Sequence, residues 1–392
     1  MGGTSFDVSV VHEGSVDLIM QGEIDHMPVR LPMVEIRSIG AGGGSIAAVH
    51  PGSRLQVGPE SAGSHPGPAC YGRGGTRPTV TDANVVLGRL DGESFLGGDM
   101  RLDSPAARAA ISAEIAEPLD LSVEAAAEGV LIVTNSTLGA AIRLSLFEKG
   151  FDPREFAMIA FGGAAGLHAV AVAQEIGVKR IVFPENASTL SAYGILHSNL
   201  AHDLVRSRVY PARPESLPAL KPLVGALISE AHARLEADAV PAGARQITLA
   251  ADMRYEGQAF ELTVPARDSH LDETVLASLI ADFHEIHCQR FSYADPGSPV
   301  ELVSLRVAAI GHLPTPDPKP FEVRGDGKSS KTRKIWLSGA LREVAVWKRD
   351  QIPLGGTVAG PAVIEEAYTT VLLLEGWDCH RDASGHLSAR RA

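Results

Sequence analysis

The pattern of apolar and polar positions is clearest between residues 156 and 183. An apolar run at 156–161 that predicts a buried strand is followed by a Gly162-Gly163 turn, a helix-forming stretch at 167–176, and a second predicted strand, KRIVF, at 179–183. Strand, helix and strand in this order predict a parallel, right-handed βαβ unit. Ligands of open α/β sheets bind at the carboxyl ends of the strands, so the turn after the first strand is a predicted binding position.

Capping residues predict two helices upstream of this unit. Ser104 followed by Pro105 predicts an N-cap and a helix that extends to about Ala116. Ser122 predicts the N-cap of a longer helix, which has apolar side chains close to one face and ends at Gly150. The first half of the chain is therefore predicted to have an α/β fold.

Two proline-rich breaks, at 210–222 and 313–320, divide the chain. We expect a core domain at 1–210, a linker at 211–222, and a smaller α+β C-terminal domain at 223–392 that ends in a β-rich tail. A chain of 392 residues is too long for one compact core, which agrees with this division.

Within the C-terminal domain, the pattern predicts two helices on either side of a strand region. The helices are expected at about 223–238 and 272–287, and the strands around 249–265. Turns at Gly355-Gly356 and Gly360-Pro361 punctuate the β-rich tail.

Charge and cysteine content exclude several classes of function. The formal net charge of −12, without a basic stripe, argues against binding to nucleic acid or to an anionic membrane. The Lys/Arg cluster at 328–334 is predicted to be a solvated turn. No apolar run reaches the length of a membrane span. Three widely spaced cysteines suggest a reducing cytoplasmic setting.

The first candidate site is the N-terminal stretch MGGTSFD. Gly2 and Gly3 predict a tight turn in which backbone N–H groups approach an anion, and Thr4 and Ser5 add hydroxyl groups. Asp7 is a candidate catalytic carboxylate that holds a metal ion or orients an attacking water. A plain hairpin is the alternative interpretation.

Two further glycine-rich loops strengthen the interpretation of the first. The loop GAGGGS ends in a hydroxyl donor, and FGGAAG follows the predicted strand of the βαβ unit. Three such loops in one half of the chain predict a cradle for a nucleotide. The cradle residues in these two loops are Gly42, Gly43, Gly44, Ser45, Gly162 and Gly163.

The glycine- and proline-rich segment 58–88 predicts a fixed irregular path that helps to shape a site. Cys70 and Asp82 in this segment, with His168, are candidate ligands for zinc or another divalent metal ion. A small core cysteine and a structural histidine are the alternatives. His168 is also a candidate catalytic residue. His202-Asp203 predicts either a catalytic acid–base pair or a strand-end cap.

Several longer motifs resemble the hydantoinase A / 5-oxoprolinase family, in sequence and in order along the chain. They are GGTSFDVS, GAGGGSIA, GPESAGSHPGPACYGRGG with TVTDAN, AFGGAAGLHA, LSAYGILHSNLAHD, RYEGQAFEL, FHEIHCQRFSY, ELVSLRVAAIG and GPAVIEEAYTTVLLLEGW. The resemblance covers nearly the whole chain. It implies a partial actin-like ATPase core, followed by the smaller α+β region, with the N-terminal domain of the family and its first phosphate hairpin missing.

The resemblance also implies cofactors and partners. MGGTSFD would be the second phosphate hairpin, GAGGGS a neighbouring phosphate loop and FGGAAG the adenosine-side loop, with ATP and Mg²⁺ as cofactors. The reaction would be ATP-dependent phosphorylation and hydrolytic opening of a lactam or imide ring, aided by a hydantoinase B-type subunit. The missing lobe would be supplied in cis or in trans, so we expect the isolated chain to lack ATPase and lactamase activity.

Two alternative functions follow from the same resemblance. One is a subunit of an ATP-dependent acetone- or acetophenone-type carboxylase. The other is a non-catalytic remnant that only binds the B-type partner.

Overall fold

The computed structural model describes residues 1–391 except 20–21, 25–26, 30–32, 53 and 316–326. These residues form two compact units. The first comprises Met1–Ser191 and Lys319–Ala392, and the second comprises Ala192–Pro318. This division differs from the expected one, because the C-terminal tail belongs to the same unit as the N-terminal half.

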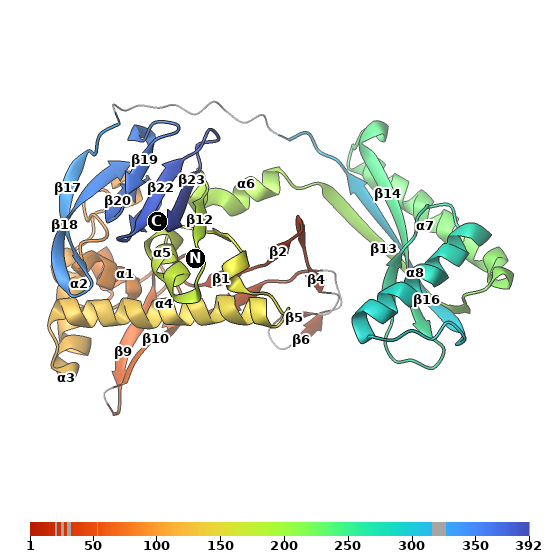
Figure 1. Ribbon diagram of the computed structural model, residues 1–392, viewed down its shortest axis with the longest axis horizontal. Coiled ribbons are helices and arrows are strands. Elements are labelled where there is room, and N and C mark those ends of the chain that lie inside the picture. Colours follow the sequence, from red (N-terminus) through yellow and green to blue (C-terminus); the bar gives the residue numbers. More distant parts are fainter. Residues whose placement is uncertain (20–21, 25–26, 30–32, 53, 316–326, 392) are drawn as a thin grey trace. The chain divides into compact units, whose positions relative to one another are not determined.

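The sheet of the first unit explains why the tail returns to it. Its strand order is β11 (Met158–Ile159), β12 (Arg180–Phe183), β23 (Leu387–Arg391), β22 (Trp377–Arg381) and β19 (Thr357–Ala359). β11 and β12 are parallel, and β23 then pairs antiparallel with β12 along four residues. The tail therefore continues the sheet that the βαβ unit begins (Figure 1).

The predicted βαβ unit is confirmed, with α5 (Ala165–Ile176) connecting β11 to β12. α5 packs between α4 (Val123–Phe147) and β21 (Thr370–Leu373). β21 belongs to a four-stranded tail sheet with β17 (Lys331–Leu337), β18 (Ala340–Lys348) and β20 (Ala362–Glu365). Segments far apart in sequence thus enclose the N-terminal end of α5.

The long helix α4 begins where its capping residue predicts, because the Ser122 hydroxyl accepts a hydrogen bond from the N–H of Ala125. Among the described residues, α4 is the helix that is long and apolar enough to cross a membrane, which corrects the expectation from the sequence. One such helix is weak evidence, because the core helices of water-soluble domains meet the same criterion.

The preceding helix, α2 (Ser104–Ile111), starts one residue earlier than predicted. Its N-cap is Asp103, whose carboxylate accepts from the N–H of Ala106, and Pro105 lies in the first turn. The helix continues through a π-helical turn, Ser112–Ala116, into the short α3 (Glu117–Leu119). The helical extent is therefore close to the prediction, but its regular part is shorter.

Short two-stranded ladders form the N-terminal region. β1 (Phe6–Val8) pairs with β8 (Arg37–Ile39), and β9 (Ser45–His50) pairs with β10 (Arg54–Ser61). The shorter strands between them are β2 (Val11–His12), β3 (Ser15–Val16), β4 (Leu18–Ile19), β5 (Gly22–Ile24), β6 (Met27–Val29) and β7 (Met33–Val34).

Segment 58–88 is less irregular than predicted, because it contains the helix α1 (Val80–Val86). Thr79 and Asp82 form a reciprocal capping box at its first turn. The sequence signal for this helix was present at Thr79, but the surrounding glycines and prolines masked it.

The second unit is an antiparallel sheet with the order β13 (Leu200–Pro211), β16 (Val300–Gly311), β14 (Arg245–Tyr255) and β15 (Leu262–Pro265). The helices α7 (Leu217–Ala237) and α8 (Glu273–Phe291) share a hydrophobic core with it. The short helix α6 (Leu190–Leu196) spans the boundary between the two units.

The predicted linker at 211–222 is wrong. These residues are the end of β13, a 3₁₀ turn at Pro214–Ser216 and the first turns of α7. Pro218 lies in the first turn of α7, where the missing N–H of proline costs no intrahelical hydrogen bond. The second break falls partly on 316–320, which lie outside the described residues.

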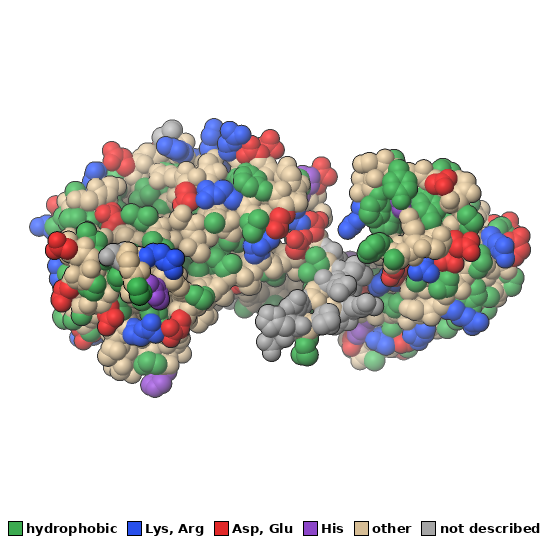
Figure 2. Space-filling model, turned by 90° about the horizontal axis from the view of Figure 1, so that it is seen from below, with side chains coloured by type: hydrophobic (Ala, Val, Ile, Leu, Met, Phe, Trp, Pro, Cys, Tyr) green, Lys and Arg blue, Asp and Glu red, His purple; other side chains and the backbone are tan. Residues whose placement is uncertain are grey.

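On the face shown in Figure 2, basic and acidic side chains are intermingled, and no large basic patch is visible. This distribution agrees with the negative net charge.

We predict that Gly166→Ala destabilises the first unit by about 1–3 kcal/mol, the usual cost of overpacking. A Cβ atom at Gly166, in the first turn of α5, would overlap the backbone carbonyl of Thr370. The measurement is urea unfolding followed by tryptophan fluorescence, since Trp336, Trp347 and Trp377 all lie in this unit.

The matched control is Gly129→Ala in α4, where the nearest atom to the new Cβ is the side-chain Cδ2 of Leu55 at 3.4 Å. This variant is expected to be as stable as the parent or slightly more stable, because Ala favours the helix over Gly. Equal stability of the Gly166 and Gly129 variants would contradict the close approach of α5 and β21.

Candidate functional site

A cavity of about 280 Å³ lies in the first unit, where the N-terminal hairpin, α1, α5 and the tail loop 365–370 meet. It brings together one or more residues from each of the three glycine-rich loops of the sequence. The wall also contains residues that the sequence did not single out. The lining residues that bear on its chemistry are Gly2, Gly3, Gly43, Tyr71, Thr81, Asn84, Asp91, Gly163, His168, Glu365, Glu366 and Thr369.

The N-terminal hairpin presents free donors to solvent. Gly2 donates its N–H to the Ser5 carbonyl and closes the turn. Gly3 and Thr4 are exposed, and within the described residues their N–H groups have no hydrogen-bond acceptor. These free N–H groups suit an anion such as a phosphate.

Asp7 lies next to this turn, on β1, and its side chain is exposed. Its carboxylate accepts hydrogen bonds from the hydroxyls of Ser5, at 3.3 Å, and Ser38. An exposed carboxylate among hydroxyl oxygens is a donor set that Mg²⁺ prefers, because this ion takes one or two carboxylates and keeps several waters. The residues present therefore fit the implied magnesium ion.

The loop of Gly42, Gly43, Gly44 and Ser45 does not offer free N–H groups, which corrects its predicted role as a phosphate cradle. Gly43 and Gly44 donate to the carbonyls of Gly2 and Gly3 at 2.9 and 2.6 Å, and Ser45 donates to Gly42. Gly42 donates to the Ser45 hydroxyl. This loop supports the hairpin from behind, where glycine is needed because a Cβ on Gly42 would lie 2.6–2.7 Å from the backbone of Gly3.

The third loop lies at the N-terminus of α5. Gly162 uses its N–H to bond the Ala187 carbonyl, whereas Gly163 is exposed and lines the cavity. α5 has no side-chain N-cap. The N–H groups of Ala164 and Leu167 donate to the carbonyls of Met1 and Ala164, whereas those of Ala165 and Gly166 have no acceptor within the described residues. A helix N-terminus with free N–H groups carries partial positive charge and favours an anion.

The predicted metal site of Cys70, Asp82 and His168 is wrong. Asp82 is fully buried, and its carboxylate accepts hydrogen bonds from the N–H groups of Ala69, Cys70 and Thr79 and from the Thr79 hydroxyl. These bonds use the lone pairs that a metal ion would need. No group of three His, Cys, Asp or Glu side chains in the described part of the chain could hold a metal ion.

Cys70 is a core residue rather than a reactive thiol. It is fully buried, and burial, together with the neighbouring Asp82, raises the pKa of its thiol well above the usual range. A thiol with a raised pKa is a poor metal ligand and nucleophile, because both roles need the thiolate.

His168 lies on α5 and is 2 % exposed. Its Nδ1 lies 2.7 Å from Oδ1 of Asn135, so Nδ1 carries the ring proton. Burial, with a smaller contribution from the nearby Arg89, lowers the pKa of His168 to about 3. The imidazole is therefore neutral near pH 7, and its Nε2 is a hydrogen-bond acceptor that has no partner in the described chain.

We predict that His168 makes the first unit less stable in acid. Its folded pKa is lowered below the ordinary 6.5, so its contribution is complete above pH 6.5 and is lost as the pH falls towards 3. The unfolding free energy should fall by about 1.4 kcal/mol per pH unit between pH 6 and 4 from this group. In His168→Gln this part of the slope should disappear, as measured by urea unfolding with tryptophan fluorescence.

His232→Gln is the control for this slope, because His232 is exposed on α7. The pH dependence of the first unit should be unchanged in that variant. An identical slope in the parent and in His168→Gln would show that His168 titrates normally.

His202 and Asp203 do not form a pair, which corrects the predicted acid–base role. Consecutive residues of a strand point to opposite faces of the sheet. His202 instead contacts Asp238 on the loop after α7, with Nε2 2.5 Å from Oδ2. Both residues lie in the second unit, and the cavity lies in the first.

The tail loop 365–370 is the part of the site that the analysis of the sequence missed. Glu366 is nearly buried at the cavity wall, and one of its oxygens lies 2.8 Å from an Arg349 guanidinium nitrogen. Burial raises the pKa of Glu366, although Arg349 opposes the shift. The signals in the sequence were a pair of acidic residues directly after the apolar run AVI and the motif GPAVIEEAYTTVLLLEGW that contains them, to which no role in the site was assigned.

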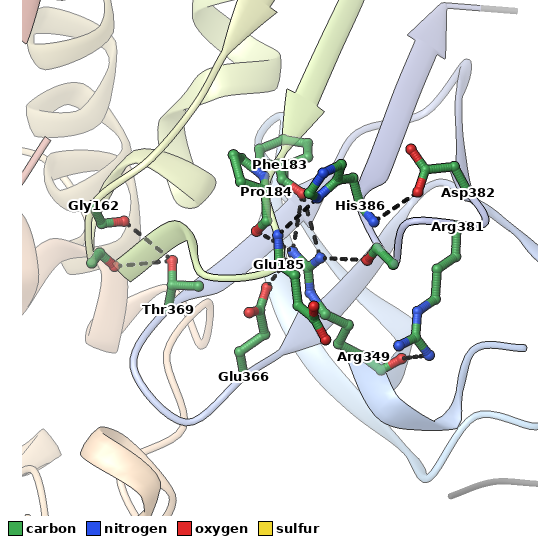
Figure 3. A network of polar contacts seen from close by, with 12 residues as sticks. Gly162, Phe183, Pro184, Glu185, Arg349, Glu366, Thr369, Arg381, Asp382 and His386 are labelled. Carbon is green, nitrogen blue, oxygen red and sulfur yellow. Dashed lines mark hydrogen bonds and ion pairs between the residues drawn. The ribbon is translucent and has the colours of Figure 1, made fainter. Parts of the chain in front are cut away.

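Arg349 connects this loop to the βαβ unit. It is 6 % exposed, and its guanidinium donates to the carbonyls of Phe183, Pro184 and Gly385 (Figure 3). Thr369 adds a second connection, because its hydroxyl points towards the carbonyls of Gly162 and Gly163. The tail thus fixes the third glycine-rich loop in place.

Arg333 corrects the prediction that the Lys/Arg cluster at 328–334 is a solvated turn. Arg333 lies on β17, its side chain is 14 % exposed, and it pairs with both Asp91 and Glu365. Lys331 also contacts Asp91, at 2.5 Å. These cations lower the pKa of Asp91 despite its partial burial.

Comparison with known proteins identifies the relatives of this chain. The family description Hydantoinase/oxoprolinase matches residues 1–204, and Hydantoinase/oxoprolinase C-terminal domain matches residues 218–389. The chain is 38 % identical to the caprolactamase subunit alpha of Pseudomonas jessenii over 98 % of its length. It is 32 % identical to a 5-oxoprolinase of Pestalotiopsis fici over 95 %, and 30 % identical to the acetone carboxylase beta subunit of Xanthobacter autotrophicus over 98 %.

Solved structures give the same result. The ATP-dependent caprolactamase of Pseudomonas jessenii matches the whole chain with a TM-score of 0.80 at 37 % identity, over 58 % of that protein. A nucleotide-free acetone carboxylase matches the whole chain with a TM-score of 0.89 at 25 % identity, over 57 % of that protein. The expected α/β fold class is thereby confirmed. The chain spans 56 % of the caprolactamase and acetone carboxylase subunits and 30 % of the 5-oxoprolinase.

Proposed function

Because this chain belongs to the hydantoinase/oxoprolinase family, we propose that it is part of an ATP-dependent cyclic amidase that opens a lactam or imide ring. The observation that carries the proposal is the cavity, whose wall contains a free backbone N–H of the hairpin, the N-terminus of α5 and the unpartnered Nε2 of His168. Greater identity to the caprolactamase subunit, 38 %, than to the acetone carboxylase subunit, 30 %, supports an amide over a ketone substrate.

The residues that would hold the nucleotide follow from their free donors. Gly3, Thr4 and Gly163 would bind phosphate oxygens through N–H groups, and the first turn of α5 would add its partial positive charge. Asp7 would hold Mg²⁺ with the hydroxyls of Ser5 and Ser38 beside it. ATP, when bound, supplies the phosphoryl group that makes an amide oxygen a better leaving group.

Other residues in and near the cavity wall hold the phosphate-binding groups in place. Thr81 donates its hydroxyl hydrogen bond to the Gly43 carbonyl and so holds the supporting loop behind the hairpin. The tail loop, which also lines the cavity, is held in place through Arg349 and Thr369. These contacts keep the phosphate-binding groups in fixed positions, which is the condition for electrostatic stabilisation of a transition state.

The names of the relatives support a partner subunit. The caprolactamase and acetone carboxylase proteins are named as alpha and beta subunits. We propose that a hydantoinase B-type subunit completes the amidase, and that a segment equivalent to the part of the relatives that this chain does not match supplies the second lobe in cis or in trans. The proposed setting is the cytoplasm.

The experiment joins this chain to the N-terminal part of the caprolactamase subunit alpha, adds a B-type subunit, and measures ATP hydrolysis with different substrates. Caprolactam and 5-oxoproline test the amidase, and acetone with bicarbonate tests the carboxylase. The proposal predicts ATP hydrolysis that depends on one of the cyclic amides and yields the opened amino acid.

Two other results of the ATP hydrolysis assay would replace the amidase with a different function. ATP hydrolysis that depends on acetone and bicarbonate alone would replace the amidase with a carboxylase, which the TM-score of 0.89 to the acetone carboxylase structure favours. Complex formation without ATP hydrolysis would identify a non-catalytic binding partner. Matched assemblies that contain the unaltered caprolactamase subunit control for the competence of the B-type subunit.

A further inference from the structure

Two buried uncharged acceptors on the cavity wall have no partner within the described chain, and a third wall oxygen, Oε1 of Glu366, is ion-paired with Arg349 but makes no hydrogen bond. His168 is 2 % exposed and Asn84 is 2 % exposed, and both line the cavity. The unpartnered atoms are Nε2 of His168 and Oδ1 of Asn84. Buried polar atoms without a partner are rare, because each costs free energy that a hydrogen bond would recover.

The hydrogen-bonding partners of both side chains fix these atoms as acceptors. Asn84 donates its Nδ2 hydrogen to the Val80 carbonyl at 3.0 Å, which assigns the free atom as the amide oxygen. His168 carries its proton on Nδ1, which faces Asn135, so its Nε2 has a lone pair and no hydrogen. A ligand that satisfies both atoms must therefore bring hydrogen-bond donors.

The charges around the cavity indicate that the hydrogen-bond donor of the ligand is an uncharged group. The three acidic side chains in the wall are already paired, since Asp91 and Glu365 contact Arg333 and Glu366 contacts Arg349. The nearby guanidinium of Arg89 opposes a second positive charge at His168. A cationic ligand would therefore find no carboxylate without a counter-charge here, although Oε1 of Glu366 pairs with Arg349 without a hydrogen bond. A neutral donor, in contrast, meets two free acceptors.

We propose that the cavity recognises an uncharged N–H group of its ligand through Nε2 of His168 and Oδ1 of Asn84. Two ligands of the proposed reaction carry this chemistry: the amino group of the adenine base, whose two hydrogens match two acceptors, and the ring N–H of a secondary lactam, whose single hydrogen matches one of them. This inference rests on the proposed function for the identity of these two ligands, but the requirement for a donor follows from the cavity itself.

The test uses the chain with its histidine rings labelled with ¹⁵N, and the Nε2 signal of His168 is followed by NMR. The signal is assigned by its absence in His168→Gln. Adenosine and caprolactam are titrated separately, alongside N6,N6-dimethyladenosine and N-methylcaprolactam, in which methyl groups replace the donor hydrogens. We expect one of the two donor ligands to shift the Nε2 signal in a saturable way towards the value of a hydrogen-bonded nitrogen.

The methylated partner of that ligand should bind at least about 10-fold more weakly, because each acceptor that a removed hydrogen would have met stays unpaired. Adenosine and caprolactam thus distinguish the two sources of the N–H group. If neither shifts the signal, or if methylation leaves the affinity unchanged, the cavity holds water only and the inference is overturned.

The ligand affinity of Asn84→Leu provides a second test, which does not depend on a substitution at His168. This variant should bind the ligand that shifts the Nε2 signal at least about 10-fold more weakly than the parent does. The exposed control His232→Gln should bind that ligand with unchanged affinity. Unchanged binding by Asn84→Leu would remove Asn84 from the recognition site.

The KM of the assembled enzyme for N-methylcaprolactam distinguishes the recognition of the N–H group from the amidase function. If the assembled enzyme hydrolyses ATP in response to caprolactam but accepts N-methylcaprolactam with the same KM, the amidase function stands and the recognition by N–H is overturned. If the enzyme has no amide-dependent activity, the adenosine titration still tests the acceptor pair.

Discussion

Replacement of Asp7 by Ala is expected to lower amide-dependent ATP turnover of the assembled enzyme by roughly 10²–10³-fold, the scale for removing one preorganised electrostatic group. Asp7 is the carboxylate beside the free N–H groups of the hairpin, and its two oxygens hold the hydroxyls of Ser5 and Ser38. The measurement is the steady-state rate of phosphate release at saturating ATP and lactam.

Asp7 is exposed, so its removal should change the folding of the first unit little. Asp99→Ala is the matched control, because Asp99 is an exposed aspartate in the same unit, outside the cavity wall. Turnover in that variant should equal that of the parent. Normal turnover in the Asp7 variant would reduce the MGGTSFD hairpin to an ordinary turn and would remove it from the nucleotide site.

Arg349→Leu is expected to destabilise the first unit by about 3–5 kcal/mol, the cost of breaking a buried ion pair from one side. The substitution removes the donors to three backbone carbonyls and leaves the carboxylate of Glu366 nearly buried without its cation. The measurement is urea unfolding at pH 7 followed by the fluorescence of the tryptophans, all of which lie in the first unit.

The surface pair of Arg342 and Glu375 provides the control for this prediction. Both side chains are exposed, at 44 % and 75 %, so Arg342→Leu should cost no more than about 1 kcal/mol. The double variant Arg349→Leu, Glu366→Gln should recover part of the loss, because the unpaired charge is gone. If the two arginine variants are equally stable, Arg349 does not fix the tail to the βαβ unit.

The loss of unfolding free energy in Arg349→Leu should also depend on pH. The pKa of Glu366 is already raised by burial, and it should rise further without Arg349. The carboxyl is then neutral over a wider acidic range, so the cost of the substitution should be smaller at pH 5 than at pH 7. An equal cost at both pH values would mean that the lost carbonyl bonds, and not the lone charge, dominate.

Local signals in the sequence predicted the elements that depend on neighbouring residues. The Ser122 hydroxyl caps α4, and the order of apolar runs around Gly162-Gly163 gives the parallel pair of β11 and β12. The same local reasoning failed at 211–222, because prolines in the first turns of a helix look like a linker when only composition is considered. It failed at Asp82 for a related reason, since a capping carboxylate and a metal ligand are the same residue type.

The sequence by itself therefore determined the α/β class, the βαβ unit and the three glycine-rich loops that identify the family. These features depend on residue spacing and on the preferences of single residues, which are printed in the chain. Only the tertiary structure decided which glycines keep free N–H groups, because Gly43 and Gly44 lose theirs to the carbonyls of Gly2 and Gly3. It also decided that the tail loop of Glu366 and Arg349 completes the cavity, because pairing between β12 and β23 joins segments about 200 residues apart, and no local pattern encodes that contact.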